Sequence, residues 1–503
     1  MKFTHNVLVI SDIHLGEDLS PSADEGTTLA CDLAERQLVA FLRHYTRRRR
    51  DGLPWRLVIN GDLIDFQSIW VDPTDPRFED VDIQVDSDSR DFGIRRGPLA
   101  AAAMLDLVVV RHAEFFSALA RFIARGNRVE IIAGNHDTEF QFEETQIRFR
   151  SAVADAWRAL PASSRQGARP ADEVAAGIHF HPWFFYEEGQ MWIEHGHQYD
   201  ECCSFAYQLE PRLPGTNELL MNVDWSGTRY ITNRVREAAP HQQDDWSAFG
   251  YFQFAIELGF RGAGNLVRAY ANFAAALLRV WRGNRGRKRR QPYKAHHERL
   301  HDLADQWSLP SELLISLDGL RRRPVISNLV RLAGVLMLDK VVAYTGTILV
   351  SILMLILIPM PWSVAFIVLS FLLAHGVTKK LARGRIIDPS LALSLASGRI
   401  LRKVDAQFVV MGHTHEPVNQ TVESRTYFNT GTWLPSGKAG VLHAFTHVVL
   451  RYSEHGAKAT LCQWRDGGSR AFTPGWVPTG SGRDEAQTKQ TDSESDNAES
   501  VVV

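Results

Sequence analysis

The sequence predicts an α/β protein whose layers of strands and helices form one body, interrupted by a long helical insertion. Short β-branched or apolar runs alternate with stretches in which apolar residues recur every three or four positions. Each strand-like run ends in a cluster of polar residues. Alternating strands and helices favour layered sheets with functional loops at the strand ends. A length of 503 residues leaves room for the insertion beyond one ordinary domain.

The overall composition argues against a disordered chain, a polytopic transporter and a disulfide framework. Hydrophobic residues make up 45% and charged residues 23%, and 56 basic against 58 acidic residues leave a net charge of −2. This balance gives no global bias toward nucleic acid. Four cysteines are too few for a disulfide framework, so we expect a reduced, cytoplasmic compartment. The apolar run at 7–10 is too short for a signal-peptide core, and none is expected.

Five short runs rich in apolar or β-branched residues are predicted to be buried strands: 6–10, 56–60, 128–133, 191–195 and 407–411. Helices are predicted at 29–47 and 106–125, and the second has apolar residues spaced by three and four. Residues 70–96 are rich in Asp, Pro and Arg, which predicts a long surface loop over a site.

The insertion is predicted at 241–385, between a body formed by 1–240 and 386–476. Residues 246–281 combine an apolar, aromatic side with a cationic side, as helices at a membrane interface do. A core helix of the soluble body is the alternative. The basic block at 279–299 fits an anionic membrane surface, and nucleic acid is the less favoured partner.

Two uncharged apolar runs, 341–358 and 362–377, lie inside the insertion and are separated by a Pro-Met-Pro sequence. The first is near the length that spans a bilayer, and the second is slightly shorter. Together they predict a membrane hairpin at 341–377. Basic residues flank it on both sides, so the positive-inside rule puts both ends in the cytoplasm. The acidic tail at 477–503 lacks the apolar residues needed to order itself.

Polar motifs follow the predicted strands, in this order: Asp12-Ile13-His14, Gly61-Asp62, Gly134-Asn135-His136-Asp137, His195-Gly196-His197 and Gly412-His413-Thr414-His415. Any one of them is weak evidence, because most such motifs are turns. The full set, each motif after a strand, predicts convergence at one sheet edge. Oxygen and imidazole donors without thiolate suit Mn, Fe or Zn better than Ca. The donors are numerous enough for two cations that share a carboxylate.

This ordered set resembles the calcineurin-like metallophosphoesterase superfamily over residues 6–200 and 404–450. The resemblance implies a β-sandwich flanked by helices, with seven ligands for two divalent cations: Asp12, His14 and His415 for the first, Asn135, His195 and His413 for the second, and Asp62 bridging both. It also implies that His136 lies beside the substrate phosphate and that Asp137 orients His136. The sequence Asn429-Thr430-Gly431-Thr432 resembles the turn that follows the last histidine motif in this family.

Several nearby residues receive other interpretations. His195 directly follows its strand and is the predicted ligand of its motif, with His197 as the alternative. Asp65 is predicted to support its loop, and Asp200 to lie behind the ligands. The histidines at 179 and 181, on an adjacent apolar strand, are interpreted as structural.

The motifs at 11–16, 61–66 and 195–200 resemble those of the UDP-2,3-diacylglucosamine hydrolases, which cleave a pyrophosphate in a lipid-linked nucleotide. The resemblance implies hydrolysis of a phosphoester or pyrophosphate by metal-activated hydroxide, on a lipid-linked or membrane-proximal substrate. Manganese is the expected metal, with iron or zinc as alternatives. The competing functions are a non-catalytic membrane-bound scaffold that binds metal or phosphate, and a nucleic-acid phosphodiesterase.

The metal site also limits the membrane topology. Candidate ligands lie on both sides of the hairpin in sequence, so they meet only if the chain crosses the membrane an even number of times or not at all. Two apolar runs satisfy this requirement. We therefore expect a cytoplasmic catalytic body, attached to the inner face of the cell membrane through 246–281 and 341–377.

Overall fold

The computed structural model describes residues 4–49, 52–76, 87–234, 259–283, 290–336, 338–360, 362–382, 388–435, 442–453 and 456–475. The predicted disordered tail at 477–503 lies outside these residues. So do 246–258 of the predicted interfacial helix and 284–289 of the basic block.

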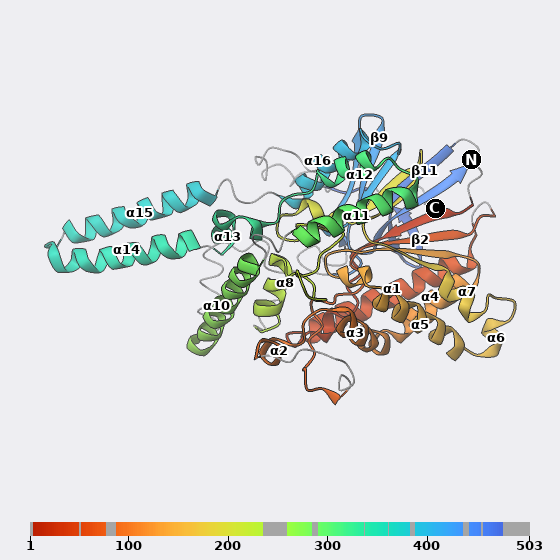
Figure 1. The fold of residues 1–503 in the computed structure, drawn as a ribbon, viewed down its shortest axis with the longest axis horizontal. Helices are drawn as coiled ribbons and strands as arrows, with labels where there is room; N and C mark the ends of the chain where they lie inside the picture. The colour runs from red at the N-terminus through yellow and green to blue at the C-terminus, as the bar shows by residue number, and fades with distance from the viewer. Residues whose placement is uncertain are drawn as a thin grey trace.

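Two mixed β-sheets form the centre of the protein (Figure 1). The first has seven strands in the order β12 (Gly468–Ala471), β11 (Gly456–Arg465), β10 (Thr446–Ser453), β1 (Asn6–Ile10), β2 (Trp55–Asn60), β3 (Arg128–Ile132) and β4 (Ile178–His181). The second has five in the order β5 (Phe184–Glu187), β6 (Met191–Glu194), β7 (Phe408–Met411), β9 (Arg425–Thr430) and β8 (Pro417–Val422). All five predicted strands are present, and the mixed α/β class is confirmed.

The two sheets pack face to face through one apolar cluster. It joins Val9 of β1 and Val58 of β2 to Ile193 of β6 and Phe428 of β9. The strands are buried on both faces, which explains why their sequences read as continuous apolar runs instead of alternating ones.

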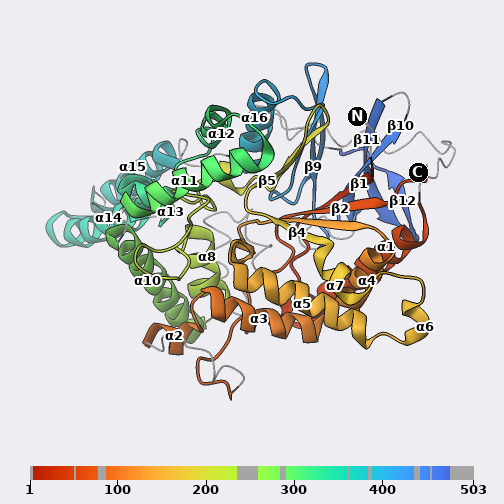
Figure 2. The same ribbon diagram turned by 45° about the vertical axis from the view of Figure 1, so that its right-hand side comes forward.

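Helices cover the outer face of each sheet (Figure 2). The seven-stranded sheet is covered by α1 (Glu25–Arg47), α3 (Pro98–Arg111), α4 (Ala113–Ala124), α5 (Glu143–Ala159) and α7 (Ala171–Ala176). The five-stranded sheet is covered by α11 (Arg290–Trp307), α12 (Ser311–Asp318) and α16 (Pro389–Leu401). Residues 290–318 of the predicted insertion thus belong to the core of the body. The shorter elements are η1 (Glu17–Leu19), α2 (Ser87–Phe92), η3 (Thr138–Gln141), α6 (Ala162–Arg165), η4 (His197–Tyr199), α8 (Val223–Gly227), η5 (Thr228–Thr232), η8 (Val325–Ser327) and α13 (Leu329–Val335).

The helical stretch predicted at 106–125 is confirmed, but it belongs to two helices, because the chain leaves α3 at His112 and starts α4. The His112 ring is fully buried and lies between two partners. Its Nδ1 is 2.9 Å from Oε2 of Glu35, and its Nε2 accepts from the backbone N–H of Gly16 at 3.2 Å. The apolar periodicity continues through the break, so periodicity alone does not reveal it. The predicted loop at 70–96 contains α2, and 77–86 lie outside the described residues.

The apolar side of α10 (Gly259–Gly283) is covered by protein. Phe273, Leu277 and Val280 are buried in a cluster with Val223 of α8 and Tyr230 of η5. For residues 259–281 of the predicted interfacial segment 246–281, the packing is therefore that of the alternative, a core helix of the body. Arg268 and Arg282 lie on its exposed side.

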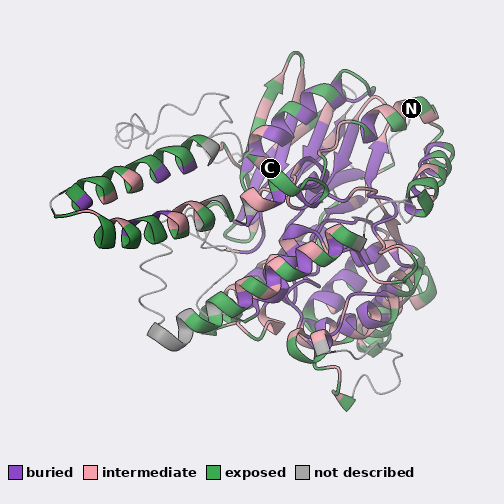
Figure 3. Cartoon of the chain, turned by 60° about the vertical axis from the view of Figure 1, so that its left-hand side comes forward, coloured by how far each residue is buried: buried purple, intermediate pink, exposed green. Residues whose placement is uncertain are grey.

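Helices α14 (Leu338–Leu357) and α15 (Trp362–Ala382) pack against each other and project from the body as a pair (Figures 1 and 3). In length and composition, Trp362–Lys380 could cross a membrane, and Val342–Leu357 is a shorter apolar helix. Their large apolar side chains point outward: Leu349, Ile356 and Leu373 are each more than 60% exposed. The buried positions carry small or hydroxylated residues, such as Thr347, Ser351 and Thr378.

Candidate metal centre

The candidate ligands lie in loops that directly follow five strands. Asp12 and His14 follow β1, Asp62 follows β2 and Asn135 follows β3. His195 follows β6, and His413 and His415 follow β7. Strands β1, β2 and β3 run parallel, and so do β6 and β7. Parallel strands end at the same edge of a sheet, so each sheet presents its ligands along one edge.

The backbone at these positions adopts an unusual conformation. Asp12, His14, Asp62, His413 and His415 all have φ between 54° and 72°, in the left-handed region that non-glycine residues rarely occupy. Such a conformation costs of order 1–3 kcal/mol per residue and persists where the surrounding structure enforces it. Five of these in one site indicate that the loops are shaped for side-chain placement.

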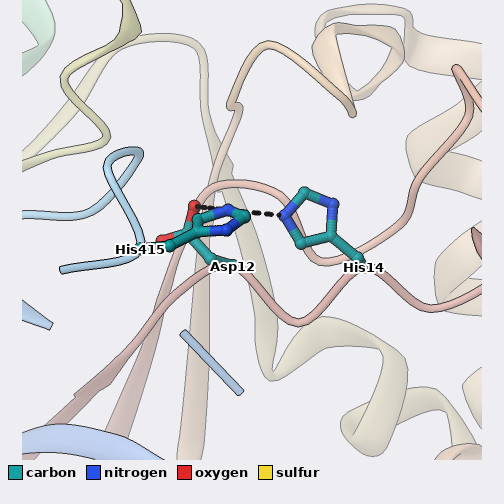
Figure 4. A group of neighbouring side chains, drawn as sticks. All are labelled: Asp12, His14 and His415. Carbon is teal, nitrogen blue, oxygen red and sulfur yellow. Dashed lines mark hydrogen bonds and ion pairs between the residues drawn. The ribbon is translucent and has the colours of Figure 1, made fainter. Parts of the chain in front are cut away.

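Three residues from the first and last motifs form one ligand group (Figure 4). Nε2 of His415 is 3.3 Å from Oδ1 of Asp12 and 3.1 Å from Nε2 of His14. A ligand atom from each of the three lies within 4.8 Å of those of the others. His415 lies about 400 positions from the other two in sequence. These are the three residues predicted for the first cation.

A second group lies beside the first and is connected to it by Asp62. Oδ2 of Asp62 is 3.1 Å from Nε2 of His195 and 4.0 Å from Nε2 of His14. The same oxygen thus faces one ligand of each predicted cation, which is the geometry that a bridging carboxylate needs. Oδ1 of Asn135 is 3.2 Å from Nε2 of His195. Asp12, Asp62 and His195 also form a group of mutually close donors.

His413 occupies a different position in the second group. Its ring centroid is 5.5 Å from that of His195, but its Nε2 faces Oδ2 of Asp200 at 3.2 Å. Cys203, Asp200 and His413 form a third group of close donors. Asp200 therefore lies behind a predicted ligand, as its sequence position suggested.

His195 is oriented as a ligand, whereas His197 is enclosed. Nδ1 of His195 lies 2.8 Å from the carbonyl oxygen of Asn60, so the ring can donate there and present Nε2 to Asp62. Nδ1 of His197 is buried and has no hydrogen-bond partner among the described residues. Burial, reinforced by the charges of His195 and His413, holds the pKa of His197 well below its ordinary value.

The orienting partner of His136 is Asp65. Nδ1 of His136 lies 2.9 Å from Oδ1 of Asp65. The expectation that Asp137 does this is wrong, because its carboxylate accepts from the backbone N–H groups of Gly134 (2.7 Å), Asp62 (3.2 Å) and Leu63 (2.8 Å). Asp137 thus ties the loop after β3 to the loop after β2. Burial and the charge of Asp62 raise the pKa of Asp137 to about 7.

Glycines in the motifs allow the loops to approach each other closely. A Cβ atom at Gly134 would collide with Oδ1 of Asp62, and one at Gly412 would collide with Oδ2 of Asp12. Gly134 and Gly412 are therefore each required by the carboxylate of another motif.

Burial opposes ionisation of the two central carboxylates, but their polar partners together outweigh it. For Asp12, the hydrogen bond from His415 and the charges of His195 and His415 lower the pKa. For Asp62, the charges of His195 and His136 and the hydrogen bond from His195 hold the pKa well below the ordinary value. For His195, burial lowers the pKa but Asp62 raises it to about 9, whereas burial and the charge of His136 lower the pKa of His14 to about 3.

The predicted structural histidines lie away from this site. Nε2 of His181 and Nδ1 of His179 are 2.9 Å and 3.4 Å from Oε2 of Glu130, across the β3–β4 pair. The turn after the last motif supports the ligand loops: Asn429 donates to the carbonyl of Gly412 at 2.7 Å, and Thr430 lies 2.6 Å from Ser11, which contacts Asp12.

Sequence reasoning missed two residues that border the site. Asp224, in α8, contacts Asn135 at 3.1 Å, and Gln67 contacts Asp224 at 2.9 Å. Gln67 directly follows the Gly-Asp-Leu-Ile-Asp-Phe segment, which was a usable signal. Asp224 has no recognisable motif around it, and only the fold brings it here.

No protein-family model matches the chain, and no curated protein matches it. The assignment of the site therefore depends on its own geometry. The donor set fits a pair of divalent cations: it combines ionised carboxylates with an amide oxygen and imidazoles, and one carboxylate oxygen faces both groups.

Proposed function

We propose that this protein is a dinuclear-metal-dependent phosphoesterase of the calcineurin-like metallophosphoesterase type. The observation that carries the proposal is the position of Asp62 Oδ2 between His14 and His195. Asp12, His14 and His415 would hold one cation, and Asn135 and His195 the other, with His413 beside them. When bound, two such cations would neutralise charge on the phosphoryl oxygens and acidify a water.

The residues next to these ligands have their own tasks in the proposal. His136 would donate a proton from Nε2 to the leaving oxygen, since Nδ1 is engaged by Asp65. Burial lowers the pKa of His136, but the charges of Asp65 and Asp62 raise it well above the ordinary value, so the ring keeps a proton to donate. Asp137 would keep the two ligand loops in register through its three backbone contacts.

The test of this function combines metal binding with turnover. Full-length protein loaded with manganese should bind about two ions per chain and hydrolyse members of a panel that includes nucleoside-diphosphate lipids, phospholipids, cyclic dinucleotides and nucleic acid. Asp62→Asn should reduce turnover by at least about 10³-fold and lower the manganese content. Two bound ions without turnover of any phosphoester would support the scaffold alternative. Turnover unchanged in Asp62→Asn would exclude the proposed site.

We also propose that α14 and α15 enter the membrane as a hairpin and attach the body to its cytoplasmic face. Large apolar side chains face outward and small or hydroxylated ones face inward, which is the reverse of a soluble helical pair. The inward hydroxyls of Thr347, Ser351 and Thr378 bond to carbonyls of their own helices, so these three groups need no water. Lys379 and Lys380 stand at the base, where lipid headgroups are anionic.

A charge placed on the hairpin separates the membrane from the soluble interpretation. Leu353 and Leu369 are 49% and 59% exposed, so lysine there would be tolerated in a soluble protein. In a bilayer each lysine costs roughly 2.5–3.5 kcal/mol, and Leu353→Lys/Leu369→Lys should convert a membrane fraction that resists alkaline wash into an extractable one. Val110→Lys, at a position on α3 that is 81% exposed, is the control and should change nothing. Extraction of the wild type by salt alone would contradict insertion.

A further inference from the structure

Two hydrogen-bond donors converge on one carboxylate oxygen beside the candidate metal centre. Oδ2 of Asp224 accepts from Nε2 of Gln67 at 2.9 Å and from Nδ2 of Asn135 at 3.1 Å. Nε2 of His136 lies 3.8 Å from the same oxygen. The donors belong to the loops after β2 and β3, whereas Asp224 belongs to α8, in the segment after β6. Donors from two loops beside the candidate ligands thus bind the carboxylate of a third segment.

Each donor is held in place by a second contact. Nε2 of Gln67 also donates to the carbonyl oxygen of Asn135 at 3.0 Å. Oδ1 of Asn135 faces His195, which turns its Nδ2 toward Asp224. His136 is fixed through Nδ1 by Asp65. Donors fixed in advance bind an anion without the cost of reorganisation.

The helix that carries Asp224 is also fixed over the site. The side chain of Asn222 caps α8 by accepting from the N–H of Trp225 at 2.8 Å. The guanidinium of Arg96 lies 4.7 Å from the centre of the Trp225 ring, and its NH2 group donates to the carbonyl of His136 at 3.2 Å. The Asp224 side chain is 26% exposed, so it can turn toward solvent while the helix stays in place.

We propose that Gln67 and Asn135 form the binding site for one non-bridging phosphoryl oxygen, and that Asp224 occupies this site as an internal competitor until a phosphate displaces it. The inference rests on the proposed phosphoesterase function, in which His136 serves the leaving oxygen. A carboxylate oxygen and a phosphoryl oxygen are both anionic acceptors, and amide donors bind either. The negative charge of Asp224 would weaken binding of phosphate and thereby assist release of the product.

Binding of inorganic phosphate to the manganese-loaded full-length protein tests this. Asp224→Asn keeps the shape and removes the charge, so phosphate affinity should rise about tenfold. Gln67→Met removes a donor and should lower the affinity by about three- to tenfold. Glu218→Gln is the matched control, because it also removes one negative charge from this segment. Glu218 pairs with Arg95 at 3.3 Å, and the substitution should change phosphate affinity less than twofold.

The signs of the two effects decide the outcome. A rise in phosphate affinity in Asp224→Asn together with a fall in Gln67→Met supports the site. A fall in phosphate affinity in both variants would mean that Asp224 only supports the loops, and the inference is overturned. An affinity that is unchanged or undetectable in Asp224→Asn also overturns it. Manganese content is measured in the same samples: a wild type that binds no manganese contradicts the proposed function, whereas an unmoved phosphate affinity in manganese-loaded protein contradicts only this inference.

Discussion

Nδ1 of His136 lies 2.9 Å from Oδ1 of Asp65, and this contact sets the direction in which the ring points. The Asp65 carboxylate is itself fixed, because it accepts from the hydroxyl of Ser68 at 2.6 Å and from the N–H of Gln67 at 3.1 Å. Burial opposes ionisation of Asp65, but the charge of His136 lowers its pKa. The contact thus leaves Nε2 of His136 facing Oδ2 of Asp224 at 3.8 Å.

Asp65→Asn should slow hydrolysis most for esters whose leaving group must be protonated. Turnover of an alkyl phosphoester should fall about 10²-fold, and turnover of a nitrophenyl ester should fall much less, since nitrophenolate leaves without protonation. Steady-state kinetics on both esters, with manganese content as a second readout, measures this. Asp106→Asn, which removes an exposed acid on α3, is the control. Equal losses on both esters would refute the orienting role.

Gly134→Ala should damage the metal centre through Asp62. The added Cβ meets Oδ1 and the backbone nitrogen of Asp62, so the carboxylate must shift. We expect manganese affinity to fall about 10- to 100-fold, as when a partner that orients a ligand is lost. Gly468→Ala is the control, because a Cβ there has open space around it. Calorimetric titration of manganese measures both, and wild-type affinity in Gly134→Ala would contradict the bridging position of Asp62.

Asparagine substitutions at the two neighbouring histidines should have unequal effects. His195→Asn should lose one of two manganese ions, because the Nε2 that faces Asp62 disappears. His197→Asn should keep both ions, since Nδ1 of His197 is buried and contacts no candidate ligand through a hydrogen bond. Metal analysis of the purified, folded variants decides between them. Loss of an ion in His197→Asn with retention in His195→Asn would assign the ligand to His197.

A buried histidine outside the candidate ligand groups should make the fold sensitive to acid. His447 of β10 is fully buried against Phe41 and Trp433, and burial lowers its pKa to about 4 from an ordinary 6.5. The folded ring stays neutral while the unfolded chain takes up a proton below pH 6.5. Its contribution to stability is therefore complete above pH 6.5 and is lost as the pH falls toward 4.

At pH 5 this loss amounts to about 2 kcal/mol relative to pH 7. His447→Gln should remove that part of the pH dependence, so that the melting temperatures of wild type and variant converge between pH 7 and pH 5. His301→Gln, at an exposed position on α11, should leave the dependence as it is. If the melting temperatures of wild type and His447→Gln depended on pH in the same way, the prediction would be contradicted.

The predictions that succeeded from sequence concern local pattern. Strands buried on both faces appear as short apolar runs, and glycine-bearing motifs directly after them mark the loops at the sheet edges. The candidate donor motifs therefore could be located before any fold was known, and the resemblance divided them into two ligand sets. The apolar pattern at 106–125 did not reveal the break at His112, because the periodicity continues through it. The apolar side of 246–281 was assigned to lipid because a pattern does not tell which surface covers it, and from residue 259 onward protein covers it.

The sequence by itself determined the strands, the ordered donor motifs and the apolar pair of helices, because each depends on residues close together in the chain. Only the tertiary structure decided that Asp65, not Asp137, orients His136, that Asp62 lies between the two candidate ligand groups, and that Asp224 accepts from both Gln67 and Asn135. Those contacts join loops that follow different strands. Their geometry depends on how strands pair within a sheet and how the two sheets pack against each other, which no local pattern encodes.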